Sequence, residues 1–399
     1  MEHTWRWFGP NDPISLDDVR QTGATGIVSA LHEMPIGEVW PIAAIEERKA
    51  LIESHGLTWS VVESISVHED IKLNEGDAAK YIDNFAQTIR NLAACGIDTV
   101  CYNFMPVLNW TRTELEYERP SGSKALLFDF VDYCAFDLFI VERPDAADDY
   151  TDEQRKRAEQ RYRGMSDAQV AHLVHNLVAG MPANEGSYSL EEFKRHIQRY
   201  ARMSRETFRQ HFLHLLERIV PVAEECGVRL AIHPDDPPFS LCGLPRIVST
   251  EEDAAWILAA VDSPANGLTF CTGSYGSRLD NDLPRMIERF AERIYFTHLR
   301  ATKTLEDGIS FFEDDHLAGN IDMVGIVDQL LTIESRRRQA GDHRALPMRP
   351  DHGQKVLDDN HKASTPGYPA IGRLKGLAEL RGVEQALRYA KDYRPSRAV

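Results

Sequence analysis

Short apolar runs alternate with helix-like segments along most of this 399-residue chain. The runs are rich in aliphatic and aromatic residues, as expected of strands buried on both faces in a parallel sheet. They cover residues 4–8, 26–31, 57–62, 98–103, 228–233, 267–271, 294–298 and 346–349. Helical spacing of apolar residues follows them at 15–21, 42–55, 77–94, 204–226, 250–261, 282–293, 322–338 and 373–389. Eight strands alternating with helices predict a (β/α)8 barrel of the TIM type.

The ends of the last four runs favour a barrel over an open, doubly wound sheet, which would show the same alternation. Three runs end at His233, Cys271 and His298, and Asp351 follows the fourth. A barrel explains such polar endings, because it builds its active site at the carboxyl ends of its strands. We therefore predict an α/β protein with a single TIM-barrel domain over residues 1–399.

The alternation is interrupted between the fourth and fifth strands. Short β-like runs at 108–117 and 126–141 flank a Pro-Ser-Gly-Ser turn and suggest a hairpin, and residues 151–175 are charged and helical. Residues 177–189 contain two glycines and a proline and are expected to form a loop. Ser189 and Glu192 match a capping box that opens another helix. We predict that residues 109–200 are a large, mainly helical insertion that covers the site or makes a subunit contact. A further small hairpin is expected at 308–316.

Charge and cysteine usage exclude several classes of function. The formal net charge of −17 argues against nucleic acid or an anionic membrane as the main partner. The six cysteines contain no C-x-x-C pair, so neither a disulfide framework nor a zinc knuckle is expected. The first residues lack the basic and apolar segments of a signal peptide, and no run approaches the ~20 apolar residues of a membrane span. The expected location is the cytoplasm.

The four polar strand ends are suited to one metal ion. In a barrel, strands five to eight are neighbours, so His233, Cys271, His298 and Asp351 are expected to meet on one rim. Imidazole, thiolate and carboxylate all ligate divalent transition metals. A single histidine or cysteine at a strand end is more often structural, but four such residues on successive strands favour a metal site.

Further polar residues surround these strand ends and are suited to bind a polyol. They are Glu63, Asn103, Asp235, Asp236, Arg300 and Lys303, with positive charge added by Arg349 and Lys362. Asp236 and Lys303 are expected to be ordinary surface charges. His352 adjoins a predicted ligand, and histidine is the side chain best suited to exchange a proton at neutral pH. Tyr368 lies in a turn with glycine and prolines, where it is either an acid or base above the metal or a packed loop residue.

Six motifs resemble the mannonate dehydratase family from the first strand to the last helix. They are Trp-Arg-Trp-Phe-Gly at 5–9, Ile-His-Pro-Asp-Asp-Pro-Pro at 232–238, Phe-Cys-Thr-Gly-Ser at 270–274, Phe-Thr-His-Leu-Arg at 296–300, Arg-Pro-Asp-His-Gly at 349–353 and Gly-Tyr-Pro-Ala-Ile-Gly-Arg at 367–373. The resemblance implies a xylose-isomerase-like barrel with Mn²⁺ or Fe²⁺ held by His233, Cys271, His298 and Asp351. It also implies a lyase of hexuronate (glucuronate) catabolism, which converts D-mannonate to 2-keto-3-deoxy-D-gluconate. We separately expect the protein to be a homo-oligomer.

Dehydration of an aldonate needs a base for the C2 proton and an acid for the departing C3 hydroxyl. We assign this pair to His352 and Tyr368, and the sequence leaves open which is which. Substrate contacts are expected from Arg300, Asn103, Arg349 and Lys362, with Arg300 suited to a carboxylate or hydroxyl.

Two alternatives remain at this stage. One is a metal-dependent sugar isomerase or epimerase on the same barrel, which needs no acid to expel a hydroxyl. The other is a non-catalytic protein that binds sugar acids, for which a titrating pair beside the metal has no purpose.

Overall fold

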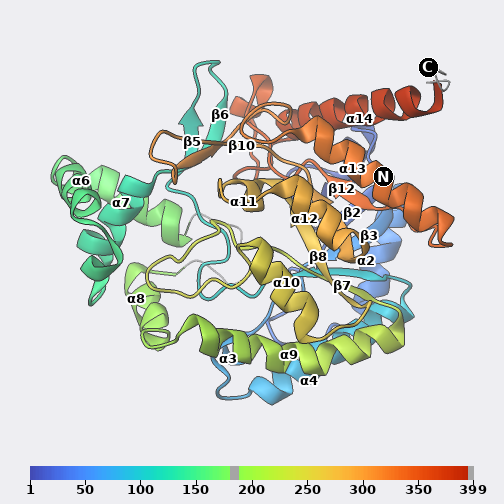
Figure 1. Ribbon diagram of the computed structural model, residues 1–399, viewed down its shortest axis with the longest axis horizontal. Coiled ribbons are helices and arrows are strands. Elements are labelled where there is room, and N and C mark those ends of the chain that lie inside the picture. The colour runs from blue at the N-terminus through green and yellow to red at the C-terminus, as the bar shows by residue number, and fades with distance from the viewer. Residues whose placement is uncertain (180–187, 394–399) are drawn as a thin grey trace.

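Eight parallel strands close into a barrel in the computed structural model, which describes residues 1–179 and 188–393 (Figure 1). Their order around the barrel is β1-β12-β9-β8-β7-β4-β3-β2. The strands are β1 (Glu2–Arg6), β2 (Gly26–Ser29), β3 (Thr58–Glu63), β4 (Thr99–Tyr102), β7 (Arg229–Ile232), β8 (Asn266–Cys271), β9 (Ile294–His298) and β12 (Pro347–Arg349). The predicted TIM barrel is confirmed, and the strands predicted as fifth to eighth are neighbours.

Helices follow the barrel strands, and the longer ones bury apolar side chains against them. They are α1 (Leu16–Gln21), α2 (Ile42–Ser54), α3 (Glu69–Leu73), α4 (Ala78–Ala94), α9 (Arg205–Cys226), α10 (Glu251–Ala260), α11 (Thr272–Gly276), α12 (Leu283–Phe290), α13 (Met323–Gln339) and α14 (Ala370–Tyr393). Ser15, Ser204 and Thr250 start their helices because each hydroxyl accepts a hydrogen bond from a backbone N–H of the first turn. The short helices α3 and α11 were not predicted.

The barrel interior is packed with side chains. Val28, Val61, Cys101 and Phe296 form an apolar cluster separate from the larger core between strands and helices. Thr269 fits this interior because its hydroxyl donates to the carbonyl oxygen of Ala231 over 3.0 Å. A filled interior leaves room for ligand only at the carboxyl ends of the strands.

The segment between β4 and β7 contains a hairpin followed by helices. Its elements are β5 (Glu114–Glu118), β6 (Lys124–Phe128), α5 (Phe130–Ala135), a π-helix (Phe136–Val141), a 3-10 helix (Ala146–Asp149), α6 (Asp152–Arg163), α7 (Asp167–Val174), a second π-helix (His175–Ala179) and α8 (Leu190–Arg199). Figure 1 shows α6, α7 and α8 at one end of the molecule, away from β7 and β8.

One of three predictions for this segment is wrong in part. The β-like run at 126–141 is wrong beyond Phe128, because the Asp129 carboxylate caps a helix there by accepting from the N–H groups of Val131 and Asp132. Residues 151–175 are helical, as predicted; they form more than one helix, and Ser166 caps α7. Most of the loop predicted at 177–189 lies outside the described residues.

A second sheet joins the insertion to the barrel. The predicted hairpin near 308–316 begins earlier, as strands β10 (Thr302–Thr304) and β11 (Phe311–Glu313). These strands pair with the insertion's hairpin in the order β10-β11-β6-β5. Figure 1 shows β5 and β6 at the top of the molecule, with β10 beside them. Phe311 and Phe312 on β11 face Phe128 and Leu127 on β6. The loop after β9 and the insertion are therefore one structural unit. Over the described ranges, no helix is long and apolar enough to cross a membrane.

Candidate metal centre and active-site cavity

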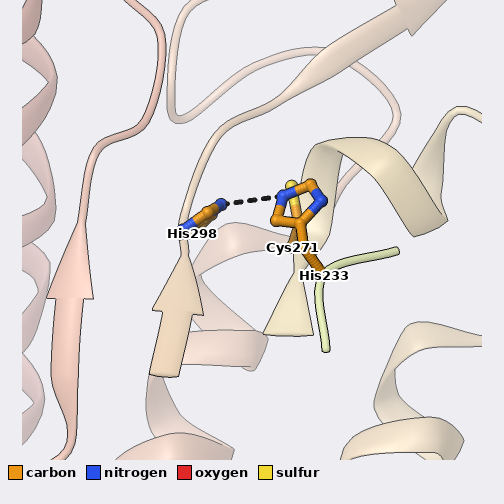
Figure 2. A group of neighbouring side chains, drawn as sticks. All are labelled: His233, Cys271 and His298. Carbon is orange, nitrogen blue, oxygen red and sulfur yellow. Dashed lines mark hydrogen bonds between the residues drawn. The ribbon is translucent and has the colours of Figure 1, made fainter. Parts of the chain in front are cut away.

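His233, Cys271 and His298 converge at the carboxyl ends of neighbouring strands (Figure 2). His233 directly follows β7, Cys271 ends β8 and His298 ends β9. One ligand atom from each side chain lies within 4.8 Å of the others. Nε2 of His233 and Nδ1 of His298 are 3.1 Å apart, as the dashed line in Figure 2 marks. Two nitrogen atoms that ligate one ion at about 2.1 Å are separated by a similar distance.

Both imidazoles are held in the neutral form. Burial lowers the pKa of His233 and, together with the charge of Arg349, lowers that of His298 well below its usual value. Nδ1 of His233 lies 2.7 Å from the carbonyl oxygen of Pro234 and donates to it, which leaves the lone pair on Nε2. Nε2 of His298 has no hydrogen-bond partner among the described residues and lies 3.5 Å from Oε1 of Glu63. A proton at this position orients Nδ1 of His298 as the ligand atom.

The Cys271 thiol lies at the N-terminus of α11. The N–H of Ser274 donates to Sγ over 3.4 Å and its hydroxyl over 3.1 Å. Burial raises the pKa of Cys271 to about 11 despite the nearby charge of Arg300. The side chain is therefore a thiol unless a cation binds it, because a coordinated cation lowers the pKa of a thiol. Two neutral imidazoles and an ionisable thiol fit a divalent transition metal.

Asp351, the fourth predicted ligand, lies beside this trio. Its Oδ2 is 3.7 Å from Sγ of Cys271 and 3.9 Å from Nδ1 of His298. Arg349 binds one carboxylate oxygen, and Nε of Arg300 lies 2.7 Å from the other. Burial opposes ionisation, but these cations hold the pKa of Asp351 well below its usual range. The residue is thus an anion next to the three other ligands.

A cavity opens beside the metal-ligand group. Six residues of the predicted metal, catalytic and substrate sites line it: His233, Asp351, His352, Tyr368, Asn103 and Arg349. The remaining wall is formed by Arg6, Phe8, Glu63, Ser64, Ser66, Val67, Met105, Asn109, Trp110 and Asp236. Polar groups from the barrel and aromatic rings from its loops therefore face one space, as in sites for small polar ligands.

His352 and Tyr368 are neighbours on the cavity wall. Their rings meet edge to face with centroids 5.2 Å apart. Nδ1 of His352 is 3.1 Å from Oε1 of Glu313, and its Nε2 is 3.7 Å from Oδ1 of Asp351. Burial raises the pKa of Tyr368 to about 12, although the charge of Arg349 lowers it. The phenol is therefore protonated at neutral pH and acts as a hydrogen-bond donor.

Two residues predicted to contact substrate do not line the cavity. Arg300 is buried beneath it, where Asp236, Glu313 and Asp351 bind its guanidinium. Lys362 is on the surface, with its side chain 66% exposed and Nζ 3.8 Å from Asp358. Arg300 was predicted from its guanidinium and Lys362 from its positive charge, and sequence does not show whether such a side chain reaches the cavity.

Asp236 was predicted to be a surface charge and is instead fully buried. Nη1 of Arg112 lies 2.7 Å from Oδ1 of Asp236, and Arg300 also binds this carboxylate. Sequence reasoning also missed Arg6, Arg112 and Glu313 as site residues. Arg6 was within reach of such reasoning, because it ends β1 on the same rim. Arg112 and Glu313 lie in the second sheet and the segment leading to it, which no periodicity connects to the barrel.

The chain is similar over its whole length to proteins of known activity. Residues 1–394 match the model of the D-mannonate dehydratase family. The mannonate dehydratases of Chromohalobacter salexigens and Marinomonas sp. are 58% and 55% identical over 388 residues, which cover 97% of this chain and 99% of each relative. The crystal structure of mannonate dehydratase from Streptococcus suis serotype 2 has a TM-score of 0.77 and 32% identity, and the match covers 100% of this chain and 97% of that one.

Proposed function

This chain belongs to the D-mannonate dehydratase family, and from that premise we propose how its own residues remove water from D-mannonate. The reaction is a hydro-lyase step that gives 2-keto-3-deoxy-D-gluconate. We propose that the substrate lies in the cavity beside His233, Cys271 and His298. A protein with this activity acts in hexuronate breakdown, and the cytoplasmic location and homo-oligomeric state expected from the sequence are part of the proposal.

The proposed ligands of the metal are His233, Cys271, His298 and Asp351. When bound, a divalent ion supplies Lewis-acid chemistry that spreads the negative charge formed beside the substrate carboxylate. We propose Mn²⁺ or Fe²⁺, as the resemblance to the family implies: imidazole ligands suit Fe²⁺, and the carboxylate suits Mn²⁺. The three-residue group of mutually close donor atoms supports this assignment, and the anionic Asp351 adjoins it.

Arg6 is our candidate for binding the substrate carboxylate in place of Arg300. It lines the cavity, and its Nη1 is buried without a hydrogen-bond partner among the described residues. The nearest carboxylate oxygen, on Glu63, is 3.9 Å away. Asn103, which also lines the cavity, is suited to a substrate hydroxyl, because an amide both donates and accepts.

We propose that His352 removes the C2 proton and that Tyr368 protonates the departing C3 hydroxyl. Glu313 accepts a hydrogen bond from Nδ1 of His352, which leaves the Nε2 lone pair as the base. Tyr368 is protonated at neutral pH and therefore starts as the acid. Water leaves from C3, and the enol that remains tautomerises to the keto acid. The observation that carries this proposal is the adjacency of His352 and Tyr368 on the cavity wall beside the metal-ligand group.

The test is a keto-acid assay on chelator-stripped protein with D-mannonate, with and without Mn²⁺ or Fe²⁺ under anaerobic conditions. We expect product only when metal is restored. His352→Asn should keep its metal and lose about 10²- to 10⁴-fold in turnover, whereas Cys271→Ser should lower the metal-to-protein ratio. Metal binding without keto-acid formation would contradict the proposed roles and would point to isomerisation on the same barrel.

A further inference from the structure

Glu313 is a buried carboxylate at the end of β11, behind His352. One of its oxygens, Oε1, receives three groups: Nδ1 of His352 at 3.1 Å, Nη2 of Arg112 at 2.8 Å and the guanidinium of Arg300. Burial opposes ionisation of Glu313, but Arg300, His352 and Arg112 together hold its pKa far below the usual range. Glu313 is therefore an anion that lies in the loop after β9 and binds the histidine proposed as the base.

Arg112 connects this carboxylate to the insertion. It is fully buried, and besides Glu313 it binds both carboxylate oxygens of Asp236, at 2.7 and 3.2 Å. Its guanidinium also stacks on the rings of Trp110 and Phe311, 4.9 and 4.8 Å from their centroids. The Trp110 ring in turn contacts His352, with centroids 4.7 Å apart. The insertion thus contacts His352 in two ways. The ring of Trp110 touches it directly, and Arg112 is connected to it through Glu313.

We propose that Glu313 is a positioning residue that fixes the ring and tautomer of His352, and that Arg112 holds Glu313 in place. The inference rests on the proposed function and adds to it the residues through which the insertion acts on the base. A hydrogen bond from Nδ1 to a fixed carboxylate orients a histidine and keeps the lone pair on Nε2. Since Arg112 lies at the start of the insertion, removing that segment would remove one of the two arginines that bind Glu313.

The first experiment compares wild-type protein with Glu313→Gln, which keeps the side chain's size and removes its charge. The matched control is Asp253→Asn, which neutralises a buried carboxylate bound by Arg205 and Arg209 outside the cavity wall. We expect Glu313→Gln to lower kcat by about 10- to 100-fold, with KM within about 3-fold and the metal-to-protein ratio unchanged. Asp253→Asn should lose stability and keep wild-type kcat.

The second experiment asks whether Glu313 acts through His352. In the His352→Asn background, adding Glu313→Gln should change kcat by less than about 2-fold, because residues that act as a unit are not additive. Arg112→Lys keeps the positive charge but cannot span Asp236 and Glu313, and should lower kcat by about 3- to 10-fold at unchanged metal content. If Glu313→Gln folds poorly, Arg112→Lys still tests the proposal, because it weakens the same ion pair from the arginine side.

Three results would overturn the inference. The first is a Glu313→Gln enzyme with wild-type kcat. The second is a loss of bound metal from Glu313→Gln in parallel with its loss of activity. The third is a double variant whose kcat is lowered by the product of the two single effects, Glu313→Gln and His352→Asn. Failure of the proposed function is a different result: metal-loaded wild-type protein would form no keto acid from D-mannonate, and the inference would then fall with it.

Discussion

At the scale of single residues, Arg6 differs from the other buried guanidinium groups of the site. Arg349 lies 2.8 Å from Glu63, and Arg300 lies 2.7 Å from Asp351, so both charges are already paired. The closest carboxylate to Arg6 is 3.9 Å away, and its Nη1 lacks an acceptor within residues 1–179 and 188–393. We therefore expect an incoming carboxylate to bind Arg6, because its charge is the least closely paired of the three and charged hydrogen bonds are strong.

Replacing Arg6 should weaken substrate binding, whereas replacing Lys362 should not. Arg6→Gln is expected to raise KM for D-mannonate by about 10- to 100-fold, the loss typical of a hydrogen bond to a charged group. Lys362→Ala removes an exposed ammonium 3.8 Å from Asp358 and should leave KM within about 2-fold. Steady-state kinetics on both metal-loaded variants check this. A raised KM in Lys362→Ala alone would restore the sequence prediction.

Residues at strand ends were predictable because the barrel dictates where those ends meet. His233, Cys271 and His298 needed only correct strands to be placed together. Glu313 and Arg112 were not predictable, since their ion pair joins segments 201 positions apart that are both outside the barrel strands. A charge in an irregular segment gives no periodic signal, so its burial depends on tertiary contacts that local patterns do not encode.

At the scale of elements, one rule gave both a correct and a wrong prediction: a continuous apolar run was interpreted as a strand. The rule holds for the barrel strands and fails for most of the run at 126–141. A buried parallel strand and a fully buried helix both appear as continuous apolar sequence. Phe130–Ala135 and Phe136–Val141 are helical and largely buried, so no polar stripe marks their period. The Asp129 cap was the available signal, because aspartate commonly starts helices.

Helix α14 approaches the loop of His352 so closely that only glycine fits at its contact. A Cβ at Gly372 would lie 1.9 Å from the carbonyl oxygen of Gln354, and backbone cannot yield as a side chain does. Gly372→Ala should therefore lower the free energy of unfolding by about 1–3 kcal/mol and reduce turnover by displacing the segment after His352. Gly382→Ala in the same helix has nothing within 4 Å of the new Cβ. It should raise stability by about 0.5–1 kcal/mol.

Urea denaturation and kcat measured on both variants check this pair. Equal free energies of unfolding for Gly372→Ala and wild type would show that α14 has room for a Cβ beside Gln354.

At the scale of the whole molecule, the two ends of the barrel carry different tasks. The proposed ligands, base and acid all lie at the carboxyl ends of the strands. The amino-terminal end instead contains ion pairs such as that of Asp342, before β12, with Arg229 at the start of β7. Neither residue lines the cavity, so variants of this pair should change stability without changing catalysis.

Asp342 allows this separation to be tested as a function of pH. Its burial opposes ionisation, but hydrogen bonds from Arg344 and the charge of Arg229 lower the pKa to about 2. A carboxyl whose pKa is lower in the folded than in the unfolded state stabilises the fold above its unfolded pKa, near 3.9. That contribution is lost as the pH falls through the folded value. At pH 7, Asp342→Asn should therefore cost about 1–2 kcal/mol after solvent screening.

The difference between wild type and Asp342→Asn should be constant from pH 7 to about 5 and roughly halved near pH 3. Urea denaturation of both proteins at each pH measures this difference. Subtracting the two free energies of unfolding cancels the contribution of the titrating groups that both proteins share. kcat and KM of the metal-loaded variant at pH 7 should match wild type. A stability difference that persists undiminished at pH 3 would mean that Asp342 acts through packing and not through its charge. A lower kcat in Asp342→Asn without any loss of stability would instead show that the amino-terminal end of the barrel influences catalysis.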